Sequence, residues 1–148
     1  MRSKIYTFGL LLSAIMFLNV TAASAQVDDP VQEFKKYIND MVVKVEHTDE
    51  PEAKRAIINN TFDELLSAFD QVEELKGLSG KEQEALNLLT EDITDKKNEL
   101  NGRAGYKIVP DNQLNQYAKY VQQDMEQAET ITISIVVALL IVIILLLI

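Results

Sequence analysis

Carboxylates surround the single histidine of this 148-residue chain and form its first candidate for chemistry. His47 lies in the stretch EHTDEPE, beside Glu46, Asp49, Glu50 and Glu52. Oxygen ligands from such a loop suit a weakly bound divalent cation. The twelve-residue spacing of an EF-hand calcium loop, with its glycine and closing glutamate, does not occur here. We therefore favour a solvated turn whose acids cap the next helix and complement its dipole.

A second group of acids and hydroxyls lies in the stretch TEDITDKKNE. Thr90, Asp92, Thr94 and Asp95 could together bind a cation. Charge runs of this density more often form the water-facing side of a helix, on which Asp92 and Lys96 are neighbours four residues apart. The sequence favours that interpretation.

The chain lacks the motifs of common enzymes. It contains no G-x-S-x-G, no glycine-rich phosphate-binding loop and no H-E-x-x-H. The absence of cysteine excludes disulfides, thiol chemistry and cysteine-ligated metals. No carboxylate has an apolar setting that would raise its pKa for acid–base work. We predict a non-enzymatic protein with no catalytic residue, no cofactor and no metal.

The stretch NGRAGYKIVPDN is the most informative polar segment, because it places Arg103, Tyr106 and Lys107 together on an acidic chain. One interpretation is a loop that uses its glycines to turn the chain, while Ile108 and Val109 cover the end of a helical bundle. The sharper interpretation is a partner-contact loop, since Tyr and Arg are frequent anchors of interfaces. Both interpretations stay open on the sequence alone.

Four segments with helical spacing must position these groups. The first begins near Asp29 and Pro30, and the last begins near Asp111. Short stripes at steps of three and four residues predict an all-α fold, a small three- to four-helix bundle with shallow crossing angles. The apolar positions are Val31, Phe34, Ile38, Met41, Val42 and Val45; Ile58, Phe62, Leu65, Phe69 and Val72, widened by Ile57, Leu66 and Leu75; Leu86, Leu89, Ile93 and Leu100, interrupted at Lys96 and Lys97; and Leu114, Tyr117, Val121, Met125 and Ala128.

Capping signals set the expected helix ends. Asp49 and Glu52 have the spacing of a capping box before the second helix, and Ser79 and Glu82 have it before the third. Gly77 suits the end of the second helix. We expect a helical bundle domain over residues 26–130.

The first 25 residues have the pattern of a cleaved signal peptide. Arg2 and Lys4 precede an apolar run over 8–18, and the sequence Ala23-Ser24-Ala25 offers a cleavage site. The alternative is an uncleaved segment retained as an anchor. Removal of residues 1–25 leaves 12 basic and 23 acidic residues, a formal net charge of −11. Such a charge repels nucleic acid, which we exclude as a partner.

Residues 131–148, ITISIVVALLIVIILLLI, predict a C-terminal transmembrane anchor, because 15 of the 18 are Leu, Ile or Val. A helix of this length spans roughly 27 Å. No glycine or proline separates it from the fourth segment, so we expect one continuous helix. Ser134 and Ala138 form a small-xxx-small pair that can associate helices in lipid. A GPI signal is disfavoured, since the candidate attachment site Asp124 is not followed by small residues.

These features together predict a single-pass cell-membrane protein. Its bundle is extracytoplasmic, its C-terminus lies at the cytoplasmic face, and residues 131–148 contact the bilayer. We expect an interaction, assembly or accessory subunit of a cell-envelope membrane complex, with a protein partner or self-association. The partner-contact candidates are Arg103, Tyr106, Lys107, Ser134 and Ala138. The alternative is an extracytoplasmic binding module for a small ligand or a divalent cation.

Overall fold

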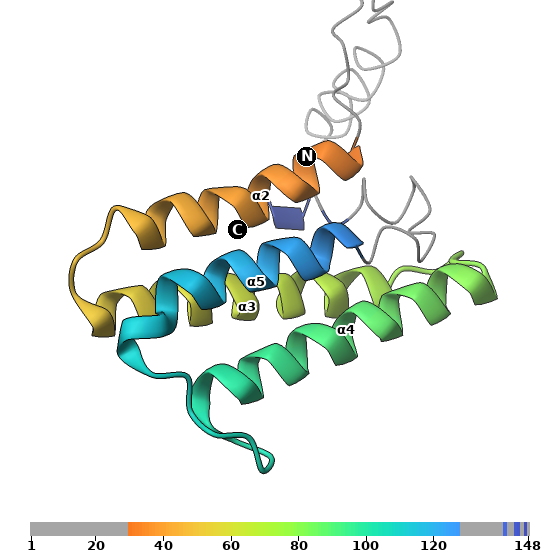
Figure 1. Ribbon diagram of the computed structural model, residues 1–148. Helices are drawn as coiled ribbons and strands as arrows, with labels where there is room; N and C mark the ends of the chain where they lie inside the picture. Colours follow the sequence, from red (N-terminus) through yellow and green to blue (C-terminus); the bar gives the residue numbers. More distant parts are fainter. Residues whose placement is uncertain (1–29, 128–140, 142–143, 146, 148) are drawn as a thin grey trace, which may run out of the picture.

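The computed structural model describes residues 30–127, 141, 144–145 and 147 (Figure 1). The described chain is helical and contains no strand, which confirms the all-α prediction. The elements are α2 (Pro30–Glu46), α3 (Pro51–Glu73), α4 (Gly80–Asn101), the short 3-10 helix η2 (Asp111–Gln113) and α5 (Leu114–Gln127).

Consecutive long helices run in opposite directions and form a small bundle (Figure 1). The backbone of α2 lies close to those of α5 and α3, and α4 lies close to α3. By contrast, the backbones of α4 and α5 approach each other little. Helix α4 is therefore held closely on one side and more loosely on the other.

The core consists of the apolar positions that the helical spacing predicts. Each of the four helices contributes fully or nearly fully buried side chains to one cluster. Small residues that the periodicity did not single out, Ala68 and Ala118, are also fully buried. The prediction for Leu75 was wrong, because α3 ends at Glu73 and the side chain of Leu75 is exposed. The predicted core residues confirmed as buried are Phe34, Ile38, Met41, Val42, Val45, Ile58, Phe62, Leu65, Phe69, Val72, Leu86, Leu89, Ile93, Leu100, Leu114, Tyr117, Val121 and Met125.

Helix ends follow the predicted signals at one of three places. The box of Ser79 and Glu82 forms, with each side chain bonded to the other residue's backbone N–H. The box predicted from Asp49 was wrong: Glu50 is the N-cap, and Pro51 begins α3 with its φ already near the helical value. Gly77 does not end α3, whose last turn closes four residues earlier on backbone bonds.

The two predicted terminal segments fall mostly outside the described residues. The signal peptide, 1–25, and the junction between α5 and the tail lie wholly outside. From the segment 131–148 the structure describes Ile141, which is buried in the core cluster, Ile144 and Leu145, which pack against it, and Leu147, which is exposed. Among the helices that the structure describes, none combines the length and apolarity needed to cross a bilayer.

Candidate functional site

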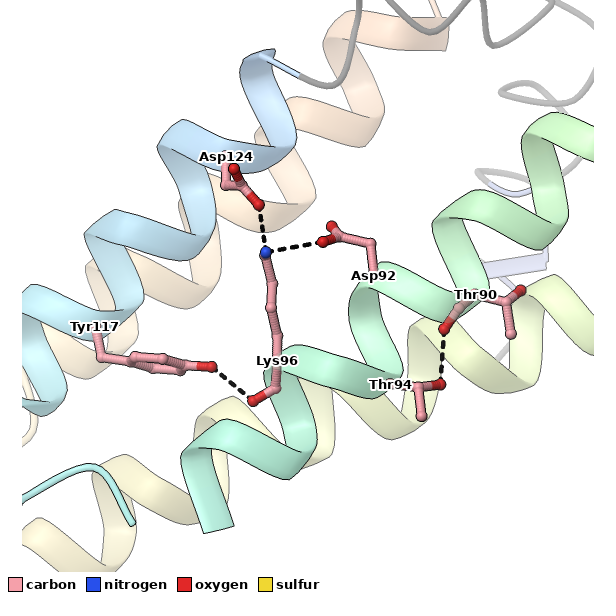
Figure 2. Close-up of polar contacts among 6 residues, drawn as sticks. All are labelled: Thr90, Asp92, Thr94, Lys96, Tyr117 and Asp124. Atoms are coloured by element: carbon pink, nitrogen blue, oxygen red, sulfur yellow. Dashed lines mark hydrogen bonds and ion pairs between the residues drawn. The ribbon is translucent and has the colours of Figure 1, made fainter. Parts of the chain in front are cut away.

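The junction between α4 and α5 is bridged by a buried lysine (Figure 2). Lys96 of α4 is 4% exposed, and its Nζ lies 2.9 Å from Oδ1 of Asp92, one turn earlier. The same ammonium group forms an ion pair with Asp124 of α5. It also lies 5.1 Å from the centroid of the Tyr120 ring, a cation–π contact. One cation thus holds two helices whose backbones stay apart.

The protonation of Lys96 follows from these contacts. Burial alone lowers the pKa of the ammonium group, because the charged form loses water. Hydrogen bonds to Asp124 and Asp92 outweigh burial and raise the pKa above its ordinary value. The side chain is therefore a permanent cation at neutral pH and acts as a structural tie.

A tyrosine closes the junction from the other helix. The hydroxyl of Tyr117 in α5 donates to the backbone oxygen of Lys96 at 2.6 Å, as Figure 2 shows. Burial is the main cause that raises the pKa of this phenol, and nearby negative charge adds to it. The hydroxyl therefore stays a donor well above neutral pH.

The interpretation of TEDITDKKNE as a water-facing surface was wrong for Lys96 and only partly right for the rest. Thr90 and Thr94 do lie apart from the junction and bond to backbone oxygens one turn earlier. The Oδ2 atom of Asp92, however, is buried and has no hydrogen-bond partner among the described residues. The sequence showed the neighbour Asp92, but Asp124 lies 28 residues away and has no local signal.

Two adjoining pockets form a groove along this junction, which we name the α4–α5 groove. The larger has a volume of about 520 Å³ and lies between the end of α4, the following loop and the start of α5. The smaller, about 320 Å³, lies over the buried lysine. The two share Glu99 and Tyr120, so they lie next to each other. Residues that characterise the groove are Asp95, Glu99, Tyr106, Lys107, Ile108 and Tyr120.

Large exposed apolar side chains gather at this groove. Tyr106, Ile108 and Tyr120 are 43%, 57% and 44% exposed, and all three line it. The other such residues in the described part of the chain, Val43, Leu75, Leu88 and Leu147, line neither pocket. A concentration of exposed apolar groups on one face is typical of a binding surface.

An arginine of α3 fixes the loop that borders the groove. The guanidinium of Arg55 donates to the backbone oxygens of Leu100 at 2.5 Å and Val109 at 2.6 Å. It also pairs with Oδ1 of Asp111 at 2.9 Å. Arg55 thus ties together the end of α4, the loop and the start of η2. Sequence reasoning missed it, since nothing near position 55 indicates a role 45 to 56 residues away.

Gly102 turns the chain into this loop. Its φ of +64° ends α4 in the left-handed region, and the amides of Gly102 and Arg103 donate to the oxygens of Glu99 and Asn98. This pair of bonds is a Schellman motif. A Cβ at Gly102 would lie 2.8 Å from the backbone nitrogen of Ile108, so the loop backbone passes directly over the glycine.

The predicted partner-contact residues fall in three places. Arg103, Tyr106 and Lys107 are exposed on the loop, and the latter two line the groove. Ser134 and Ala138 lie outside the described residues. Of the two apolar loop residues expected to cover the bundle end, Val109 is buried, whereas the prediction for Ile108 was wrong. Ile108 instead lies over Gly102 and lines the groove.

The turn around His47 contacts the preceding helical turn and α5. Its Nδ1 lies 2.8 Å from the backbone oxygen of Val43 and donates to it. Glu46 pairs with Lys119 of α5 at 2.6 Å, and this hydrogen bond lowers the pKa of the Glu46 carboxyl. Within the described part of the chain, no three His or acidic side chains are arranged to hold a metal ion.

Comparison with known proteins returns no relative: no family model, no curated protein and no solved structure matches this chain. The candidate site is therefore assigned on its own geometry. That geometry is an open groove with exposed tyrosines, carboxylates that form no ion pair among the described residues, and a fixed loop, which together can bind a protein surface or a ligand.

Proposed function

We propose that this chain is a non-enzymatic interaction or assembly subunit of a cell-envelope membrane complex, with the α4–α5 groove as its partner-binding surface. One observation carries the proposal: Tyr106, Ile108 and Tyr120 gather around the groove although each is about half exposed to water. Tyrosine and other large apolar groups are the usual energetic centre of protein interfaces.

The fixed loop supports the same function. Ordering a loop upon binding reduces affinity, because the loop loses conformational entropy. Here the three hydrogen bonds of Arg55 and the Schellman motif at Gly102 hold the loop backbone before a partner arrives. Tyr106 and Lys107 are therefore presented in a preformed arrangement, which favours a specific protein interface.

The membrane location rests on the sequence. Residues 1–25 act in this proposal as a cleaved signal peptide, and residues 131–148 anchor the extracytoplasmic bundle, with Ser134 and Ala138 available for contact with another membrane helix. A competing arrangement is the packing of the tail against the bundle, which the buried position of Ile141 favours. Extraction of membranes with alkaline carbonate separates the two: an anchored chain stays in the membrane pellet, whereas a chain with its tail folded onto the bundle is released.

Site-specific photocrosslinking tests the partner-binding surface. A photoreactive residue at Tyr106 in the full-length chain, in native membranes, should capture a defined protein identified by mass spectrometry. Leu88 is the matched control, because it is also 43% exposed but lies outside the groove. Equal capture from both positions, or none from Tyr106, would contradict the proposal. Tyr106→Ala or Arg103→Ala should weaken co-purification of that protein without lowering the melting temperature.

A second candidate, an extracytoplasmic binding module for a small ligand, has one observation in its favour. The larger pocket, about 520 Å³, has a volume within the usual range of ligand sites. A bound ligand would raise the melting temperature of the full chain by mass action. A metabolite panel that leaves the melting temperature unchanged, while Tyr106 still crosslinks to a protein, would exclude this candidate. Calcium and magnesium belong in the panel, because the alternative predicted from the sequence includes a divalent cation.

A further inference from the structure

We propose that the α4–α5 groove binds the 102–110 loop of a second copy of this chain, so that two copies pair with Arg103 and Lys107 of each facing Asp95 and Glu99 of the other. This inference rests on the proposed function and names the partner of the same surface. It follows from two groups of charges, Asp95 and Glu99 of α4 that line the groove and the basic residues of the 102–110 loop, that form no ion pair with each other or with another described residue of their own chain.

The acidic half of the surface is the smaller pocket. Four carboxylates line it, and its one lysine, Lys96, pairs with Asp92 and Asp124. Asp95 and Glu99 therefore remain without a cationic partner among the described residues. The pocket carries a formal charge of −3, which attracts a basic group.

The walls of this pocket already stabilise one ammonium group. Lys96 combines two carboxylates with the face of an aromatic ring, Tyr120. An incoming basic side chain would meet the same combination, with Asp95 and Glu99 as carboxylates and Tyr106 as an exposed ring. Arginine is suited to such a site, because its planar guanidinium can stack on tyrosine while it bonds to a carboxylate.

The basic half of the surface is the loop. Arg103 and Lys107 are exposed and have no carboxylate partner in the described chain. Tyr106 lies between them in the sequence and lines the acidic pocket, so the loop and the pocket are neighbours on one face. A two-fold axis through such a face brings each basic loop opposite the partner copy's acidic pocket. Both contacts are then made at once.

Charge reversal in the full-length chain tests this pairing. Two differently tagged copies are coexpressed, extracted in mild detergent and captured through one tag. Glu99→Lys in both copies should reduce co-capture about tenfold, and Arg103→Glu in both copies should do the same. When one copy carries Glu99→Lys and the other Arg103→Glu, one interface is native and the other has its charges exchanged, so co-capture should return.

Matched variants and a folding check make each outcome decisive. Glu84→Lys and Lys81→Glu make the same charge changes at exposed positions of α4 outside the groove, and they should leave co-capture unchanged. All variants should keep the wild-type melting temperature. Three results overturn the inference. The first is that both charge reversals leave co-capture intact, and the second is that co-capture does not return in the mixed pair. The third is that Glu99→Lys reduces co-capture but Arg103→Glu does not, which indicates that the groove binds a basic segment of a different protein.

The inference and the proposed function can fail separately. Crosslinking from Tyr106 distinguishes them, since a product at twice the mass of the chain as it is isolated from the membrane contains two copies, whereas any other product contains a different protein. If co-capture returns in the mixed pair but no other membrane protein is crosslinked or co-purified, the pairing is retained and the role as a subunit of a larger complex is rejected. If Tyr106 crosslinks to a different protein and co-capture does not return in the mixed pair, the proposed function is retained and the pairing is rejected.

Discussion

The two sides of α4 are built in different ways. Toward α3, the helix presents apolar side chains such as Leu86, Leu89 and Ile93, and the two backbones lie close together. Toward α5, it presents the buried ammonium of Lys96 and accepts a hydrogen bond from Tyr117, and the two backbones stay apart. The first side is a packed core, and the second is a bridged gap.

The two sides of α4 contribute differently: the contacts with α3 stabilise the fold, whereas the contacts with α5 leave a surface for recognition. Apolar contact gains free energy in proportion to the area removed from water, so the α3 side draws the helices together. A buried ion pair contributes little net stability, because the desolvation of both charges offsets their attraction. It does fix the distance and register of two helices. On the α5 side this spacing leaves room for the α4–α5 groove, whereas a packed apolar junction would fill it.

The largest expected effect lies on the α3 side. Ile93 is fully buried, and Ile93→Ala should reduce the free energy of unfolding by about 2–5 kcal/mol through lost burial and a new cavity. Urea unfolding followed by circular dichroism measures this change. Leu88→Ala, on the same helix but 43% exposed, should cost less than about 1 kcal/mol. Similar losses for the two variants would show that α4 has no specific packed side.

The next effect is the loss of the bridge. Lys96→Met removes the cation between Asp92 and Asp124 and leaves two partly buried carboxylates facing each other, which should cost about 1–3 kcal/mol. Lys97→Met is the control: this lysine pairs with Asp63, a more exposed partner on α3, and its loss should cost less than about 1 kcal/mol. Adding Asp124→Asn to Lys96→Met should recover part of the loss. If the changes in the free energy of unfolding caused by Lys96→Met and Asp124→Asn simply add in the double variant, Lys96, Asp92 and Asp124 do not act together.

Gly102 connects the two sides, because it turns the chain from α4 into the loop of the groove. Gly102→Ala should cost about 2 kcal/mol, since alanine is strained at positive φ and its Cβ would lie 2.8 Å from the backbone nitrogen of Ile108. Gly105→Ala has a positive φ too, but no atom lies within 4 Å, so it should cost about 1 kcal/mol. Hydrogen exchange should show faster exchange over 103–110 for the first variant. Equal losses of stability for Gly102→Ala and Gly105→Ala would mean that the close approach of Ile108 to Gly102 does not contribute to the cost.

The smallest effect is the hydroxyl of Tyr117. Tyr117→Phe removes its bond to the oxygen of Lys96 and should cost about 1 kcal/mol at neutral pH. Tyr106→Phe is the control, because the Tyr106 hydroxyl has no hydrogen-bond partner among the described residues. Its melting temperature at neutral pH should equal that of the wild type.

Burial of the same hydroxyl gives stability a dependence on alkaline pH. The pKa values of Tyr117 and Lys96 are raised in the folded chain, so the folded state binds more protons than the unfolded state above pH 10.0, the ordinary tyrosine pKa. Their stabilisation is complete below that pH and is lost as the pH rises through the folded pKa values. The melting temperature of the wild type should fall above pH 10.0, and that of Tyr117→Phe should fall less steeply. Parallel curves would contradict the assignment.

Sequence reasoning predicted the packed side of α4 and missed most of the bridged side. The residues Leu86, Leu89, Ile93 and Leu100 recur with helical spacing, which the chain itself displays. Lys96 only interrupted that pattern, because its principal partner, Asp124, lies on another helix. The loop was recognised from its glycines and its basic and aromatic residues, whereas its dependence on Arg55 was not.

What the sequence determined by itself is local: the apolar periodicity of four helices, the capping box at Ser79, the glycine turn after α4, and a hydropathy pattern that predicts membrane targeting at 1–25 and 131–148. Periodicity and capping depend on residues within a few positions of one another, so they can be read along the chain. The tertiary structure alone decided which charged residue is buried, which loop is fixed and where the groove lies. Each of these depends on pairs such as Lys96 with Asp124 and Arg55 with Val109, which only the packing of the helices brings together.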